Sequence, residues 1–218
     1  MLRHGRTAWN AERRFQGQAD PPLDDVGRVQ AYEVASLIAA LRPELIISSD
    51  LRRATQTAGP IAQLAGLEVV IEERLRERSL GHWEGLTRDE VEQRFPDEFL
   101  DWTGGRDVSR RGGESRDQVA ARAAAVFESL PDVEVVVLVT HSATAMALCA
   151  DVLGLTQRVH ILAPLANCHW SELRHDEADT SNIPWRLRAH NVGAPGPVIP
   201  FAIRPPFDTE DDAPDAQA

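Results

Sequence analysis

The sequence predicts an α/β protein with a mostly parallel central sheet that carries helices on both faces. Short runs of apolar and β-branched residues alternate along the chain with longer runs whose apolar residues recur at helical spacing. Strands that alternate with helices favour a parallel sheet, because each connecting helix packs back onto a face of the sheet. With 218 residues, 43% of them apolar, the chain is long enough to bury the core of one such domain.

The first half of the chain predicts three strands and two helices. A short strand is expected where the chain begins, ending at Arg3, and an amphipathic helix over residues 24–41. Residues 45–49 predict a buried strand, and Asp50 is placed to cap the helix that follows, which should end near Gly66. Another strand is expected over residues 68–72.

The second half predicts three helices and three strands. Thr87 and Glu90 form a capping-box pattern, which indicates the start of a short helix. The other expected elements are a helix over 114–130, a buried strand over 134–140, an apolar helix over 142–153, and two strands of a hairpin or edge pair over 167–174 and 185–191.

Composition sets the expected organisation and partners. The formal net charge is −11, which argues against a nucleic-acid or anionic-membrane partner. Acidic residues gather near the C-terminus, so we expect one domain over residues 1–203 and an acidic, disordered tail over 204–218. No apolar run reaches the ~20 residues of a membrane span, and the N-terminus lacks a signal region, so a cytoplasmic location is expected. A homodimer is one option.

Reactive side chains follow several expected strands at the same edge of the sheet. His4 follows the first strand, and His141 follows the strand over 134–140. Arg53 lies one turn into the helix behind a third strand, and Glu77 follows a fourth. Because ligands of open α/β sheets bind at the carboxyl ends of the strands, we expect these four side chains to meet in one crevice.

Together these residue types suit phosphoryl transfer. A neutral imidazole at His4 can attack phosphorus and form a phosphohistidine that water later hydrolyses. Arg3 and Arg53 can bind the phosphoryl oxygens, and His141, if protonated, can donate a further hydrogen bond. Glu77 can protonate the leaving alkoxide and then activate water. This scheme needs no metal and no other cofactor, although each of these residues alone would more often be structural.

The order of these residues resembles the histidine phosphatase superfamily, in its phosphoglycerate mutase-like branch. The resemblance covers about residues 1–192 and is carried by these segments: Arg3-His4-Gly5-Arg6-Thr7, Phe15-Gln16-Gly17, Ser49-Asp50-Leu51-Arg52-Arg53-Ala54, Leu75-Arg76-Glu77-Arg78, Gly81-His82-Trp83-Glu84-Gly85, Gly113-Glu114-Ser115 and Thr140-His141. It implies that His4 is phosphorylated, that Arg3, Arg53 and His141 form the phosphate pocket, and that Glu77 donates the proton.

The same resemblance implies that Asn10, Gln16 and Gly17 line the substrate side. The chain departs from the family at Ser142, where glycine is usual after the second histidine. This serine opens a helix whose N-terminus favours anions, so we count Ser142 among the substrate-binding residues. The chain also has only two residues before Arg3, fewer than the family usually has.

Three functions fit the resemblance: a phosphatase, a phosphoglycerate mutase and a binding module without turnover. Only 36 residues separate Glu77 from Glu114, and the chain has no lysine. This favours a phosphatase, because the mutases carry a longer and more basic insertion there. The complete set of reactive residues disfavours the binding module.

The substrate is expected to be a small phosphomonoester, because several runs resemble the group of these phosphatases that acts on glucosyl-3-phosphoglycerate. Trp9 and Trp83 lie beside the motifs, where we expect their indole faces to bind a sugar ring.

Overall fold

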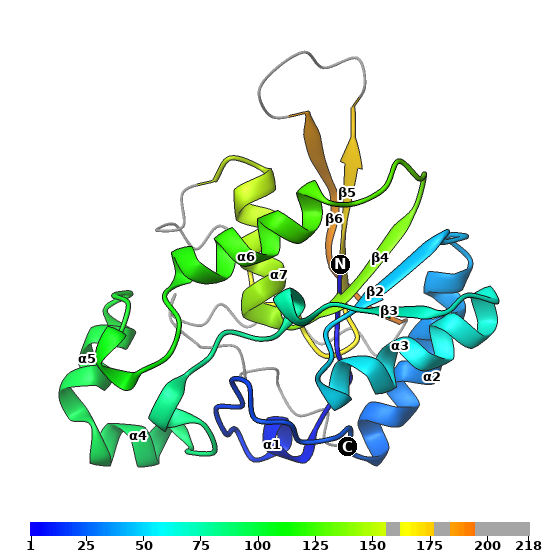
Figure 1. The fold of residues 1–218 in the computed structure, drawn as a ribbon. Coiled ribbons are helices and arrows are strands. Elements are labelled where there is room, and N and C mark those ends of the chain that lie inside the picture. The colour runs from blue at the N-terminus through cyan, green and yellow to red at the C-terminus, as the bar shows by residue number, and fades with distance from the viewer. Residues whose placement is uncertain (156–161, 177–183, 195–218) are drawn as a thin grey trace.

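The computed structural model describes residues 1–155, 162–176 and 184–194. A six-stranded sheet with the order β3-β2-β4-β1-β5-β6 runs through the molecule (Figure 1). The strands are β1 (Leu2–Arg3), β2 (Leu45–Ser48), β3 (Val69–Ile71), β4 (Val136–Thr140), β5 (Trp170–His175) and β6 (Trp185–Val192). The first four pair in parallel, while β5 is antiparallel to both β1 and β6. The predicted α/β class and mostly parallel sheet are confirmed.

Helices cover both faces of this sheet (Figure 1). Helices α2 (Asp25–Ala39) and α3 (Arg52–Ala65) lie on one face, and α6 (Arg116–Glu128) and α7 (Ser142–Val152) lie on the other. The shorter helices are α1 (Ala8–Ala11), α4 (Arg88–Arg94) and α5 (Pro96–Thr103). Two 3-10 turns, Glu73–Leu75 and Gly81–Trp83, lie between β3 and α4, and a third, Ser109–Arg111, lies between α5 and α6. Among the described residues, no helix is both long and apolar enough to cross a membrane.

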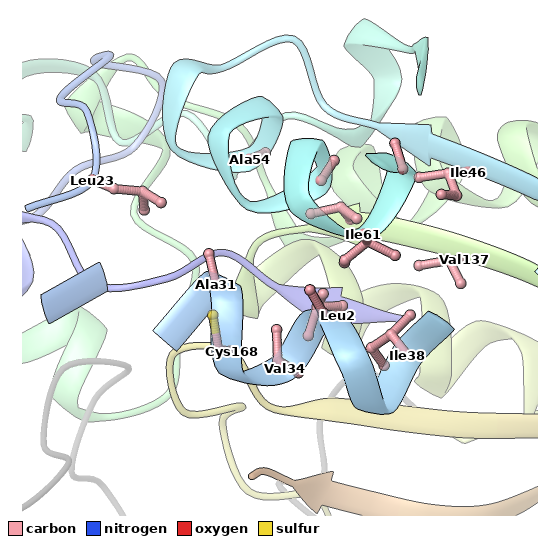
Figure 2. Packing of buried hydrophobic residues seen from close by; sticks show 14 residues of the cluster. Leu2, Leu23, Ala31, Val34, Ile38, Ile46, Ala54, Ile61, Val137 and Cys168 are labelled. Atoms are coloured by element: carbon pink, nitrogen blue, oxygen red, sulfur yellow. The ribbon is translucent and has the colours of Figure 1, made fainter. Parts of the chain in front are cut away.

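The central strands are apolar on both faces, as expected of parallel strands that helices cover on each side. Ile46 and Val137 pack with Leu2 against α2 and α3 (Figure 2). Their neighbours Ile47 and Leu138 point to the opposite face and pack against α6 and α7. Because β1, β2 and β4 pair in parallel, their carboxyl ends meet at one edge of the sheet.

A third cluster lies away from the sheet, around α4 and α5. It consists of Trp83, Val91, Phe99 and Val108, with Phe15, Leu80, Leu86, Phe95 and Trp102 packed against them. We call this cluster the aromatic lobe. The short helix predicted by the capping box is α4, and Thr87 and Glu90 make both hydrogen bonds of that motif. Helices α1 and α5 were not predicted.

Two helix starts differ from the prediction. Helix α3 has Leu51 as its N-cap residue and no side-chain cap, because Asp50 instead pairs with Arg76 at 2.5 Å. A charge-assisted pair with a guanidinium is stronger than a bond to a helix amide, which explains the change of partner. Helix α6 begins at Arg116 rather than 114, because Ser115 and Gln118 form the capping box. The boundary predicted at residues 203 and 204 lies outside the described residues, as does the tail.

Candidate active site

His4 lies directly after β1, with its ring 2% exposed. Its backbone N–H donates to the Thr140 carbonyl at 3.0 Å, which ties it to the end of β4. The ring Nδ1 lies 2.7 Å from the Gly5 carbonyl oxygen. A carbonyl oxygen can only accept, so Nδ1 carries the proton and donates it, and the neutral ring keeps a lone pair on Nε2. His4 therefore has the tautomer of a nucleophile that reacts through Nε2.

His141 follows β4 and is the N-cap residue of α7. The centres of its ring and the His4 ring are 5.1 Å apart. Arg53 Nε donates to His141 Nδ1 at 3.2 Å, and His141 Nε2 lies 3.0 Å from the Ser49 hydroxyl oxygen. Because a guanidinium can only donate, the neutral His141 ring carries its proton on Nε2 and donates it to Ser49.

Both histidines are disposed to be neutral in the free site. Burial lowers the pKa of His4 well below 6.5, and the charges of Arg53 and Arg3 lower it further. Burial and Arg53 likewise lower the pKa of His141 well below 6.5. A neutral His4 is what nucleophilic attack requires. The protonated His141 that we expected as a donor is disfavoured in the free site, and it would need the negative charge of a bound phosphoryl group beside it.

Arg53 is fully buried, with its guanidinium at the centre of the site. It donates to the Ala19 carbonyl at 2.6 Å and to the Gly17 carbonyl at 2.8 Å. Burial lowers the pKa of Arg53 to about 10, although the carboxylates of Glu77 and Asp20 oppose this shift. Arg53 therefore remains charged at neutral pH and can bind an anion.

Arg3, the last residue of β1, lies at the same site. It donates from Nη1 to the Leu165 carbonyl at 2.6 Å, and its charge acts on both His4 and His141. Two guanidinium groups thus border the two imidazole rings. An arrangement of this kind stabilises a phosphoryl group, whose oxygens accept charge-assisted hydrogen bonds.

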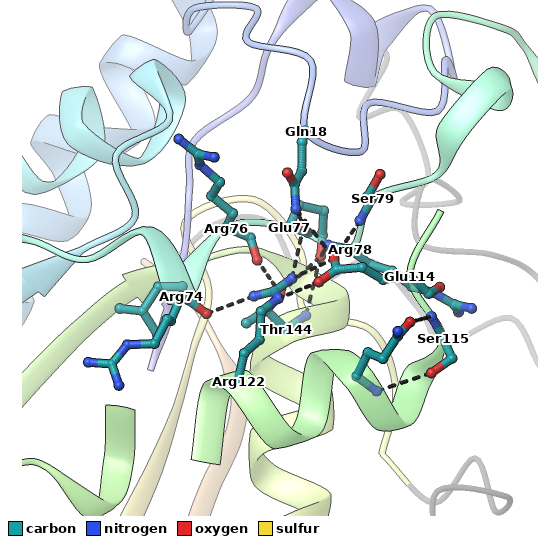
Figure 3. A network of polar contacts seen from close by, with 12 residues as sticks. Gln18, Arg74, Arg76, Glu77, Arg78, Ser79, Glu114, Ser115, Arg122 and Thr144 are labelled. Carbon is teal, nitrogen blue, oxygen red and sulfur yellow. Dashed lines mark hydrogen bonds and ion pairs between the residues drawn. The ribbon is translucent and has the colours of Figure 1, made fainter. Parts of the chain in front are cut away.

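Glu77 lies at the N-terminus of α7 (Figure 3). Its Oε2 accepts from the Ala143 N–H at 3.3 Å, and its Oε1 accepts from the Thr144 N–H at 3.3 Å and the Arg78 N–H at 2.8 Å. Unpaired amide groups point out of a helix N-terminus, and these contacts fix the position of the Glu77 side chain. Since its charge also acts on Arg53, Glu77 belongs to the same site. We call Arg3, His4, Arg53, Glu77 and His141 the strand-end pocket.

The predicted substrate-side residues lie around this pocket. Asn10 Oδ1 accepts from the Thr7 N–H at 3.1 Å and from Asn167 Nδ2 at 3.3 Å. Gln16 Oε1 accepts from the Thr7 hydroxyl at 3.0 Å, which places it in the same loop. Gly17 has φ of +50°, and a Cβ there would collide with the Glu84 carboxylate, so this turn requires glycine.

Ser142 is the first residue of α7 and is fully buried. Its hydroxyl has no hydrogen-bond partner among the residues that the structure describes. A buried hydroxyl without a partner is unfavourable, so Ser142 is ready to bond a group that enters beside His141.

Sequence reasoning assigned no role to several residues that support the pocket. Asn167 donates to the His4 carbonyl at 3.1 Å, and the Thr57 hydroxyl accepts from the Gly5 N–H at 2.9 Å. Ser49 orients His141, as described above. Thr57 could have been found from its place one turn after Arg53 on α3, whereas Asn167 lies in a loop that only the folded chain brings to His4.

The expectation for Trp83 is wrong. Its ring is 0% exposed and packs inside the aromatic lobe, where its indole N–H donates to Glu98 at 2.8 Å. It therefore offers no face to a sugar. Trp9 remains partly exposed, with its ring next to Gly85. In the part of the chain that the structure describes, no three His, Cys, Asp or Glu residues are grouped to hold a metal ion.

Comparison with known proteins agrees with this fold. The histidine phosphatase superfamily (branch 1) matches residues 1–187. A glucosyl-3-phosphoglycerate phosphatase of Mycolicibacterium vanbaalenii is 39% identical over 89% of this chain and 94% of its own length. A probable phosphoglycerate mutase of Photorhabdus laumondii is 35% identical over 85% of this chain and 86% of its own. The chain belongs to the histidine phosphatase superfamily, whose members work through a phosphohistidine intermediate.

A solved structure resembles the chain equally well. The mycobacterial glucosyl-3-phosphoglycerate phosphatase in complex with VO3 superposes with a TM-score of 0.80 at 38% identity, covering 88% of this chain and 98% of its own. The relatives are named as phosphatases and as a probable mutase, so the family is shared while the named activities differ.

Proposed function

We propose that the protein hydrolyses phosphomonoesters through a phosphohistidine at His4, without a metal. The observation that carries this proposal is the hydrogen bond from His4 Nδ1 to the Gly5 carbonyl, because it leaves the Nε2 lone pair beside two buried arginines. Nε2 attacks phosphorus, the bond from phosphorus to the ester oxygen breaks, and Glu77 protonates that oxygen. Water, deprotonated by Glu77, then attacks phosphorus, and the P–N bond breaks to release inorganic phosphate.

Arg3, Arg53 and His141 would bind the phosphoryl oxygens during both steps. Their positive charge and hydrogen bonds stabilise the transition state in a site from which water is largely excluded. Ser142 would add a donor at the N-terminus of α7, and Asn10, Gln16 and Gly17 would border the rest of the substrate. EDTA should leave turnover unchanged, and orthovanadate should inhibit it as a mimic of five-coordinate phosphorus. Loss of activity in EDTA that Mg²⁺ or Mn²⁺ restores would contradict the metal-free mechanism.

For the substrate we propose glucosyl-3-phosphoglycerate. The support is the relatives that bear this activity in their names, at 38–39% identity over most of both chains. The test compares kcat/KM for glucosyl-3-phosphoglycerate with that for 3-phosphoglycerate, since binding energy from the sugar should raise turnover as well as affinity. A ratio near one would contradict this substrate and leave the chemistry at His4 untouched.

A phosphoglycerate mutase is the second candidate, favoured by the relative of that name at 35% identity. Incubation with 3-phosphoglycerate and analysis of the products separates the two: a mutase forms 2-phosphoglycerate, whereas a phosphatase releases phosphate. The cytoplasmic location, the lack of nucleic-acid and membrane partners, and a homodimer also stay predictions. Sedimentation of the purified protein would test the last of these.

A further inference from the structure

The segment that carries Glu77 has no regular secondary structure after the 3-10 turn at Glu73–Leu75. Residues 77–80 belong to neither a helix nor a strand, so no backbone ladder fixes the place of this carboxylate. A group that delivers a proton must be held within hydrogen-bond reach of the leaving oxygen. The contacts that hold this segment therefore determine where the Glu77 carboxylate lies.

Arg122 on α6 binds the segment at two points, one within the 3-10 turn and one after it (Figure 3). It donates from Nη1 to the Arg74 carbonyl at 2.7 Å and from Nη2 to the Glu77 carbonyl at 3.0 Å. Both bonds go to backbone oxygens, and none of the hydrogen bonds recorded for Arg122 goes to the Glu77 carboxylate itself. Arg122 thus fixes the backbone from which the carboxylate projects.

Glu114 completes this arrangement from the residue just before the α6 capping box. It accepts from Arg122 Nε at 2.7 Å with Oε1, and from the Ser79 N–H at 2.8 Å with Oε2. The Gln18 amide lies 3.3 Å from the same Oε2 and also donates to the Glu77 carbonyl at 3.1 Å. The backbone is therefore held from Arg74 to Ser79, two residues beyond Glu77.

The pair is largely removed from water, with side chains 17% exposed for Arg122 and 23% exposed for Glu114. Burial opposes the charge of Glu114, but hydrogen bonds from Arg122 and Ser79 outweigh it and hold the pKa of this carboxyl below its usual range. Glu114 is thus ionised at neutral pH and forms an ion pair with Arg122. A partly buried, bidentate ion pair is also more rigid than an exposed one.

We propose that Arg122 and Glu114 are positioning residues for the proton donor, holding the backbone of Glu77 so that its carboxylate meets the ester oxygen of the substrate. This inference rests on the proposed role of Glu77. Two groups of contacts then have different functions. The amides of Ala143 and Thr144 on α7 bind the Glu77 carboxylate, while the Arg122–Glu114 ion pair fixes the backbone of the segment that carries it.

The leaving group of the substrate provides the test. An alkoxide leaves only when it receives a proton, whereas p-nitrophenolate leaves readily as an anion. A variant that misplaces Glu77 should therefore lose kcat/KM, which reports the phosphorylation of His4, on an alkyl phosphomonoester and keep it on p-nitrophenyl phosphate. Damage to the fold or to the phosphate pocket would instead lower turnover of both substrates alike.

The experiment measures kcat and KM of Arg122→Gln and Glu114→Gln on glucosyl-3-phosphoglycerate and on p-nitrophenyl phosphate. We expect kcat/KM on the alkyl ester to fall on the order of 10²-fold and kcat/KM on the aryl ester to fall less than about threefold. The value of kcat alone also includes hydrolysis of the phosphohistidine, which is common to both substrates. Arg122→Lys keeps the charge but lacks the planar fork that bonds both carbonyls and Glu114 together. Its loss of kcat/KM on the alkyl ester should therefore be smaller than that of Arg122→Gln.

Arg28→Gln is the matched control. Arg28 also pairs with a carboxylate, Asp25, and also donates to a backbone carbonyl, that of Leu23, but it lies on α2. It should leave both substrates unaffected. Equal losses on both substrates in the Arg122 and Glu114 variants, or no loss on either, would overturn the inference.

Glu77→Gln, measured in parallel, tests the proton donor separately from the residues that position it. If it shows the leaving-group dependence and the Arg122 variant does not, the positioning role fails and the proton donor stands. If Glu77→Gln itself loses no more on the alkyl ester than on the aryl ester, the proposed role of Glu77 fails, and the inference falls with it.

Discussion

The strand-end pocket buries charge, whereas the aromatic lobe buries apolar rings. In the pocket, Arg53 is fully buried and each of its nitrogens bonds a carbonyl or a histidine. In the lobe, Trp83 is equally buried, but it packs against Phe15 and Trp102 with ring centres 5.4 and 5.8 Å away. Burying charge costs free energy that must be offset by hydrogen bonds, while burying rings is itself stabilising.

This difference predicts how the two regions respond to mutation. Groups in the pocket are held for chemistry and contribute little net stability, so their loss should lower turnover more than it lowers the free energy of unfolding. Residues of the lobe contribute apolar contacts at a distance from His4, so their loss should lower the free energy of unfolding and leave the chemistry of folded molecules in place.

Loss of the nucleophile should have the largest effect. His4→Ala should lower kcat by at least about 10³-fold, because no other group can form the covalent intermediate. His141→Ala should also lower kcat severely but retain some affinity for phosphate, since the arginines remain. Steady-state kinetics with thermal unfolding as a control would check this. More than a few per cent of activity in His4→Ala would mean that the nucleophile is misassigned.

Trp83→Ala should be the largest stability change. We expect it to lower the free energy of unfolding by about 3–5 kcal/mol, the usual range for removing a buried indole. Turnover per folded molecule should stay near that of the unchanged protein. Leu100, 63% exposed on α5 in the same region, supplies the control, because Leu100→Ala should change stability by about 0.5 kcal/mol or less. A selective loss of kcat without unfolding would place Trp83 in catalysis instead.

Acid should destabilise the fold through the pocket. The folded-state pKa values of His4 and His141 lie well below 6.5, so below pH 6.5 the unfolded chain binds protons that the folded chain does not. Their contribution is therefore constant above pH 6.5 and falls as the pH drops, by up to about 1.4 kcal/mol per pH unit for each histidine. Urea unfolding between pH 7.5 and 5.5 measures this slope. His141→Gln should reduce it, whereas a slope unchanged by that substitution would contradict the account.

The smallest effect is expected at Ser142. Ser142→Ala removes a buried hydroxyl without a partner, so the free protein should gain about 1 kcal/mol of stability. The same change should weaken orthovanadate binding by roughly 2- to 10-fold, if the hydroxyl donates to the bound anion. Thermal shift and inhibition measurements test the two halves separately. Unchanged inhibition would remove Ser142 from the substrate-binding residues.

The fold class and the pocket could be predicted because their signals are local. His4 and His141 directly follow β1 and β4, and the parallel pairing of these strands brings the two rings together. Arg53 is the second residue of α3, the helix that follows β2, and β2 pairs in parallel with β4. Each of these side chains closely follows a strand, and the residues of that strand lie next to it in the sequence.

The parts that could not be predicted depend on contacts between distant segments. Trp83 stands in a recognisable motif, but only the packing of α4 and α5 against it decides that its ring points away from the pocket. Asn167 meets His4 across 163 residues of sequence. Asp50 has the spacing of a helix cap, but it pairs with Arg76, which only the folded chain brings next to it.

The most direct test of the account is to trap the phosphorylated protein during turnover and locate the phosphoryl group. Phosphohistidine survives alkaline denaturation and is lost in acid, so a rapid alkaline quench followed by peptide mass analysis can find it, and phosphorus NMR can tell Nε2 from Nδ1. We predict one phosphoryl group on Nε2 of His4, absent from His4→Ala. A phosphoryl group on another residue, or substrate turnover with no phosphoenzyme on any time scale that resolves a single cycle, would contradict the account.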